Sequence, residues 1–106
     1  MITTKQRAFL RARANGLEPV GQIGKNGIGP LVLETVSAAL EAHELIKLTV
    51  LEACPLTARE AAGRLCEALE CDPVQTIGRK IVLYRPSSES AEARAKKGRE
   101  TILLPR

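Results

Sequence analysis

The chain has 106 residues, of which 44% are apolar, and it carries a formal net charge of +4. This length fits one domain with one hydrophobic core. No apolar run approaches the roughly 20 residues that a membrane-spanning helix requires, and residues 1–16 lack the apolar segment of a secretory signal, so we expect a cytoplasmic protein with no membrane partner.

The charges are distributed unevenly along the chain. Residues 1–30 carry five Lys or Arg and one Glu, whereas residues 31–73 carry three basic and eight acidic residues. A segregated basic face is typical of proteins that bind a polyanion, although a solvated surface explains it equally well. The only aromatic residues are Phe9 and Tyr84. If the partner is nucleic acid, contacts to its backbone and shape should therefore dominate over base stacking.

The first elements are a helix and a strand that end at a glycine-rich segment. Thr3 and Gln6 have the spacing of a capping box that begins a helix, and Gly16 is placed to end it. Residues 18–23 predict a short strand. A second helix of about fifteen residues is predicted to start at Pro30, with apolar residues at helical spacing.

The second half of the chain predicts three strands and a third helix. Residues 45–51 alternate in polarity as a strand does, and Thr57 with Glu60 forms a second capping box. Residues 73–77 and 80–85 flank a tight hairpin turn. The order is helix, strand, helix, strand, helix, strand, strand.

This order predicts an α/β fold, a two-layer sandwich with an additional N-terminal helix. Right-handed strand–helix–strand crossovers orient the first three strands in parallel, and the hairpin makes the last strand of the four-stranded mixed sheet antiparallel. Residues 1–86 are expected to form the domain. Residues 87–106 are expected to be a polar, charged tail, mobile or weakly helical, ending in TILLPR, whose TILL could dock as an extended segment. Its basic residues are expected to reach for phosphates; they are Arg94, Lys96, Lys97 and Arg99.

Residues with the pattern of an enzyme site are missing from the sequence. The single histidine, His43, falls at the end of a predicted helix, where a packed or capping role is commoner than catalysis. Cys54, Cys66 and Cys71 do not have the spacing of a zinc site and are expected to be buried reduced thiols. No phosphate-binding loop or nucleophile elbow occurs. We therefore predict no catalytic residue, metal or cofactor.

The segment GKNG, residues 24–27, has a G-x-x-G pattern that leads into a helix. Gly24 and Gly27 permit close approach of another backbone, Lys25 adds a cation, and Asn26 tolerates a left-handed conformation or can donate to a phosphate. The following helix start favours anions. The pattern is similar to the loop with which KH domains clamp a nucleic-acid backbone. A plain strand-to-helix turn is an equally good interpretation.

Four segments together resemble a known family: TKQR, PVGQIGKNGIG, HELIKL and IGRKIVLYRP have the order and spacing of a CRM domain (chloroplast RNA splicing and ribosome maturation). A single such domain ending in LPR is similar to the bacterial YhbY-type proteins. The resemblance implies RNA binding, association with precursors of the large ribosomal subunit, and a fold akin to the C-terminal domain of a bacterial translation initiation factor, with strand order 1-2-4-3. Two departures are Pro30, where the family often has a hydroxyl residue, and the long polar tail.

By this resemblance residues 24–27 form the RNA loop, and Lys47 and Arg85 match basic positions of the family motifs. The predicted RNA-binding set is Gly24, Lys25, Asn26, Gly27, Lys5, Arg11, Lys47, Lys80 and Arg85. The favoured interpretation is a monomeric, non-enzymatic protein that binds ribosomal RNA in large-subunit precursors and assists ribosome assembly.

Two alternatives remain. One is an interaction module that binds a basic ribosomal protein or assembly factor through acidic helix faces, which carry Glu34, Glu41, Glu60 and Glu67. The other, weaker one is an enzyme whose site a partner completes.

Overall fold

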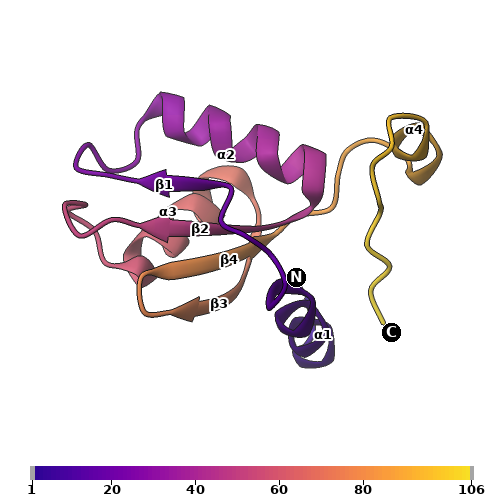
Figure 1. The fold of residues 1–106 in the computed structure, drawn as a ribbon, viewed down its shortest axis with the longest axis horizontal. Helices are drawn as coiled ribbons and strands as arrows, with labels where there is room; N and C mark the ends of the chain where they lie inside the picture. The colour runs from indigo at the N-terminus through magenta and orange to yellow at the C-terminus, as the bar shows by residue number, and fades with distance from the viewer. Residues whose placement is uncertain (1, 106) are drawn as a thin grey trace.

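The fold is a four-stranded mixed sheet with helices on both faces (Figure 1). A computed structural model describes residues 2–105, so the first residue of the predicted domain and the last of the predicted tail lie outside it. Within that range no helix is long and apolar enough to cross a membrane. The elements are α1 (Thr4–Ala14), β1 (Gly21–Ile23), α2 (Pro30–His43), β2 (Leu45–Val50), α3 (Ala58–Leu69), β3 (Asp72–Ile77), β4 (Lys80–Tyr84) and α4 (Ala91–Lys96).

The strand order is β1-β2-β4-β3, as the family resemblance implied. β1 pairs with β2 in parallel, and β4 runs antiparallel to both of its neighbours, β2 and β3. The predicted α/β class and the antiparallel last strand are therefore confirmed. β4 lies between β2 and β3, so these two strands have the same direction without pairing with each other.

The two faces of the sheet bury different side chains because successive residues of a strand point to opposite sides. Ile46, Leu48 and Val50 of β2 pack with α2 and α3 in the larger core. Leu45 packs on the other face with α1, together with Val74, Val82 and Tyr84. Helix α1 covers part of that face, Leu17, Ile102 and Leu104 pack beside it, and a hollow remains next to the end of α1.

Both predicted capping boxes are present. The Thr3 hydroxyl accepts from the Gln6 amide at 3.1 Å, and Thr57 does the same for Glu60. Helix α1 ends where predicted, with Asn15 as its C-cap and Gly16 directly after it, but Gly16 does not adopt the positive φ of a capping glycine. Strand β1 is also shorter than expected.

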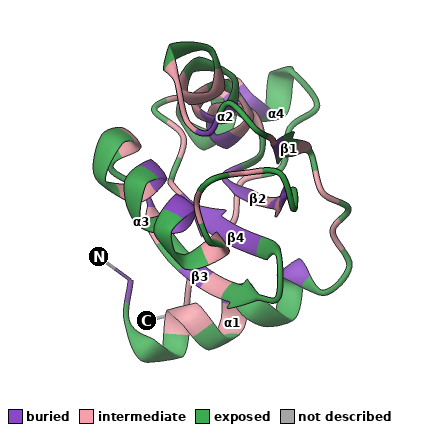
Figure 2. Ribbon diagram, turned by 90° about the vertical axis from the view of Figure 1, so that its left-hand side faces the viewer, coloured by how far each residue is buried: buried purple, intermediate pink, exposed green. Residues whose placement is uncertain are grey.

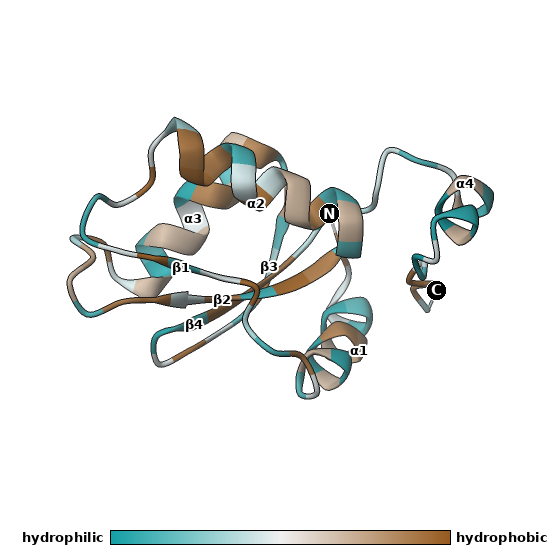
Figure 3. Ribbon diagram, turned by 45° about the horizontal axis from the view of Figure 1, so that its top comes forward, coloured by the Kyte–Doolittle hydropathy of each residue, from teal (hydrophilic) through white to brown (hydrophobic). Residues whose placement is uncertain are grey.

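The tail is packed on the domain. The expectation of a weakly helical segment is therefore confirmed and that of a mobile one is wrong, and Ile102 and Leu104 dock as part of an extended segment, as expected for TILL. The tail contains α4, a short polar helix that precedes an apolar terminal segment (Figure 3).

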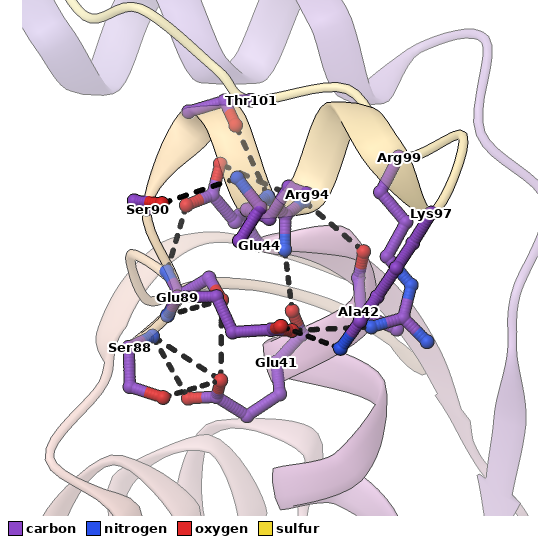
Figure 4. Close-up of polar contacts among 12 residues, drawn as sticks. Glu41, Ala42, Glu44, Ser88, Glu89, Ser90, Arg94, Lys97, Arg99 and Thr101 are labelled. Carbon is purple, nitrogen blue, oxygen red and sulfur yellow. Dashed lines mark hydrogen bonds and ion pairs between the residues drawn. The ribbon is translucent and has the colours of Figure 1, made fainter.

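Arg94 of α4 is fully buried. Its guanidinium donates to the carbonyl oxygens of Glu41 and Glu100 at 2.6 Å each, and to that of Ala42 at 3.1 Å (Figure 4). The expectation that Arg94 reaches phosphates is therefore wrong.

Glu44 completes this buried polar cluster at the end of α2. Its carboxylate accepts from the Ser87 amide at 2.7 Å and from the Ile102 amide at 2.9 Å, and it lies 4.0 Å from the Arg94 guanidinium. Glu44 also ends α2 with a φ of 65°. One residue thus ends a helix and holds the tail both at its start and at Ile102.

Replacement of Arg94 by Met should destabilise the protein, because it leaves three carbonyl oxygens without their donor and the buried Glu44 carboxylate without its positively charged partner. Loss of one partner of a buried pair costs about 3 kcal/mol. The midpoint of thermal unfolding should therefore fall by roughly 12 °C, as measured by circular dichroism. Lys96→Met is the matched control, since Lys96 is exposed on the same helix. Equal midpoints for the two variants would show that Arg94 does not hold the tail.

Candidate nucleic-acid interface

Three connections meet at one end of the molecule: residues 24–29 after β1, residues 51–57 after β2, and the hairpin turn between β3 and β4 (Figure 1). The register places them there, since Ile23 pairs with Val50 and Thr49 pairs with Lys80. Figure 2 looks onto this end, where most residues of the connections are exposed. We call it the loop end.

The G-x-x-G segment is a closed turn at the loop end. The Gly27 amide donates to the Gly24 carbonyl oxygen at 3.0 Å, and the exposed Lys25 and Asn26 form the tip. Gly27 has a φ of 65° and is buried, and a Cβ there would lie 3.6 Å from Pro55. The turn itself therefore requires Gly27. Gly24 lies outside the left-handed region, and a Cβ there would meet Leu51 at an ordinary 3.7 Å.

Helix α2 starts directly beyond this turn and points its N-terminus to the loop end. Gly29 is the N-cap and Pro30 the first helical residue, so no side chain caps the helix. The first helical hydrogen bond runs from the Leu33 amide to the Gly29 carbonyl oxygen. The amides of Leu31 and Val32 precede it, and the positive end of the helix dipole lies near Lys25. This end of α2 suits an anion.

Two of the predicted lysines share the open part of the sheet. Lys47 of β2 pairs with Val82, and Lys80 of β4 pairs with Thr49, so both lie on the α1 side of the sheet. They line a shallow hollow together with Gln75 and the end of α1. Lys80 stands at the loop end, and Lys47 lies further along the sheet.

Arg79 is a cation at the loop end that the sequence reasoning did not include. It occupies the hairpin turn beside Lys80 and lies 3.7 Å from Glu52, with its side chain 57% exposed and that of Glu52 90% exposed. Such a pair contributes little to stability and exchanges readily for another anion. The position of Arg79 in a tight hairpin turn, next to the predicted Lys80, could have identified it from the sequence.

The remaining predicted cations lie apart from the loop end. Lys5 and Arg11 are exposed on α1, with Arg11 one turn before the end that lines the hollow and Lys5 in the first turn. Arg85 follows β4 at the opposite end of the sheet. Its guanidinium donates to the carbonyl oxygens of Leu69 and Ser37 at 3.1 Å each. Its donors therefore serve the fold, and the structure does not bring Arg85 to the other predicted residues.

Two of the four carboxylates of the alternative interpretation are engaged within the chain. Glu41 accepts from the amide and the hydroxyl of Ser88 and from the hydroxyl of Ser87, and these bonds, chiefly that of the Ser88 hydroxyl, hold the pKa of Glu41 below its usual value. Glu60 accepts from the Thr57 amide in the capping box, which lowers its pKa. Glu34 and Glu67 are exposed.

The strand order and the G-x-x-G turn between the first strand and the following helix are the arrangement that the family resemblance implied. The chain belongs to the CRS1/YhbY (CRM) domain family, whose model matches residues 2–85. This confirms the resemblance recognised in the sequence.

Relatives with known names support the same membership. The chain is 41% identical over 92 residues to the Probable RNA-binding protein YqeI of Bacillus subtilis, a match covering 87% of this chain and 96% of YqeI. It is 40% identical to a Haemophilus influenzae RNA-binding protein, over 84% of this chain and 90% of the relative. Among solved structures, a Staphylococcus aureus protein described as a candidate RNA-binding protein matches with a TM-score of 0.76 and 39% identity, covering 99% of this chain and all of the other.

Alanine at the two loop glycines should separate the requirements of the turn. Gly27→Ala places a Cβ on a residue with positive φ and should lower the free energy of unfolding by about 1 kcal/mol. Gly24→Ala meets only an ordinary contact and should leave stability unchanged or raise it by about 0.5 kcal/mol. Urea unfolding of both variants measures the difference. Equal losses would contradict the assignment of Gly27 as the strained position.

Proposed function

We propose that this protein binds RNA through the loop end and the adjoining open face of the sheet, and that its target is ribosomal RNA in precursors of the large subunit. One observation carries the proposal: Lys25, Arg79 and Lys80 gather with an uncapped helix N-terminus at one end of a CRM-family chain. The names of the relatives support RNA as the ligand.

The arrangement favours recognition of backbone and shape. A phosphate can approach the exposed turn at Lys25 and the open start of α2. Tyr84 is 4% exposed and Phe9 packs against the α1 core, so neither aromatic ring of the chain offers a platform on which a base could stack freely. Specificity for one ribosomal site would then come from the folded shape of the RNA.

We also propose that the RNA-binding domain ends at residue 86, as the sequence predicts. The family model ends at residue 85, which supports residues 1–86 as the RNA-binding unit with the tail as a docked extension. The protein would act as a cytoplasmic monomer without catalysis and would assist ribosome assembly by holding RNA in a shape that other factors complete.

Lys25→Ala should weaken RNA binding without unfolding the protein, because Lys25 is exposed at the tip of the turn. The slope of log affinity against log salt concentration is negative, and each lost phosphate contact reduces its magnitude by about 0.7 to 0.9. Filter binding or fluorescence anisotropy over a salt series measures it. Arg64→Ala is the control and should keep the slope, because Arg64 is an exposed cation on α3 outside the predicted RNA-binding set. If both variants keep it, the turn does not hold the RNA backbone.

The preferred ligand should be folded RNA. Affinities for folded ribosomal RNA fragments, unstructured RNA of the same length and duplex DNA are compared at one salt concentration near physiological, and the folded fragments should bind most tightly. Equal affinity for all three would reduce the protein to a general polyanion binder. Tightest binding to a short single strand would contradict recognition by shape.

The alternative, a module that binds a basic protein through acidic helix faces, rests on the exposed Glu34 and Glu67. Two measurements distinguish the two functions. An excess of polyphosphate should release RNA from the loop end. The double substitution Glu34→Gln with Glu67→Gln should leave RNA affinity unchanged. Reduced sedimentation with ribosomal fractions for this double variant, with RNA affinity intact, would favour the alternative.

A further inference from the structure

Two of the three cysteines form a close pair at the junction of α3 and β3. The Sγ atoms of Cys66 and Cys71 lie 3.5 Å apart, within hydrogen-bond distance. The backbone holds them together as well, since the Cys71 amide donates to the Cys66 carbonyl oxygen at 3.3 Å. Glu70 between them adopts a left-handed conformation with a φ of 53°, which turns the chain back on the helix end. A disulfide requires an S–S distance of about 2 Å, so a small side-chain movement would close it.

The surroundings of the pair favour reaction at one sulfur. Cys71 is 8% exposed, and Cys66 is half-buried and opens the pair to solvent. The hydrogen bond between the two thiols and then the positive charge of Arg85 lower the pKa of Cys71, and the same hydrogen bond raises the pKa of Cys66. Arg85 is fixed nearby by its bond to the Leu69 carbonyl oxygen. A thiolate is the form of cysteine that attacks an oxidant.

We propose that Cys66 and Cys71 are a redox modification site that closes to an intrachain disulfide when the protein meets a peroxide. The Cys71 thiolate attacks one oxygen of hydrogen peroxide, the O–O bond breaks, and Cys71 becomes a sulfenic acid while the departing hydroxide takes a proton to form water. The Cys66 sulfur then attacks the Cys71 sulfur. The S–O bond breaks, the Cys66 proton leaves with the hydroxyl group as a second water, and the S–S bond forms. Two thiols are oxidised and one peroxide is reduced.

The third cysteine provides an internal control. Cys54 lies in the connection after β2, and its sulfur accepts from the Leu56 amide, with no other cysteine sulfur within hydrogen-bond distance among the described residues. The basic residues that flank the cysteines allow trypsin to separate them. Residues 65–79 hold Cys66 and Cys71 in one peptide, and residues 48–59 hold Cys54 in another.

The test treats the reduced, full-length protein with hydrogen peroxide, alkylates the remaining thiols and identifies the tryptic peptides by mass spectrometry. The peptide 65–79 should lose two hydrogen atoms and take up no alkyl group, and a reducing thiol should reverse this. The peptide 48–59 should be alkylated throughout. Alkylation of all three cysteines after peroxide, a disulfide that includes Cys54, or one that links two chains would each overturn the proposal.

Two variants test the order of attack. In Cys66→Ser the sulfenic acid on Cys71 has no thiol to attack it, so dimedone should label Cys71. Cys54→Ala should form the disulfide at the wild-type rate. Absence of the dimedone label in a Cys66→Ser protein with native circular dichroism would overturn Cys71 as the attacking sulfur, and the peptide measurement on the unchanged protein tests the disulfide without any variant.

Discussion

The antiparallel pairing of β2 with β4 is the constraint on which the rest of the structure depends. Its register sets Leu45 opposite Tyr84 at one end and Thr49 opposite Lys80 at the other. A slip by one residue would turn the apolar side chains of β2 from the α2 and α3 core to the open face. The same register places the start of β4 at the loop end and Arg85 at the opposite end, so it also decides which cations stand near residues 24–27.

Much of the fold could be predicted from the sequence because its signals are local. The capping boxes of Thr3 and Thr57 need only residues three positions apart, and alternation in residues 45–51 needs only a strand. The strand order is not local, and it came from the family resemblance. The expectation of a mobile tail was wrong because the contacts that fix the tail are not local either. Arg94 is buried by carbonyl oxygens on α2, 52 and 53 positions away in sequence, and composition cannot report such a contact.

The candidate site was predictable in part for the same reason. The turn at residues 24–27 is a continuous motif, so its glycines, Lys25 and Asn26 could be identified together. Arg85 belongs to an equally specific motif, yet its donors are occupied by carbonyl oxygens of α2 and α3. A basic residue in a motif can serve either the fold or a ligand, and only its tertiary contacts distinguish the two. Arg79 shows the converse, since its loose pair with Glu52 leaves its charge available.

The two ends of the molecule therefore use charge in opposite ways. At the end that holds Glu44 and Arg94, both charged groups are buried, and each has polar partners. Partners are needed there because removal of one member of a buried ion pair costs about 3 to 5 kcal/mol of stability. At the loop end, Lys25 and Lys80 are exposed, so they contribute little to folding. Their release of counterions can then contribute to binding a polyanion. A protein of this size can thus keep an exposed, positively charged surface without weakening its core, because buried and exposed charges lie at opposite ends of one sheet.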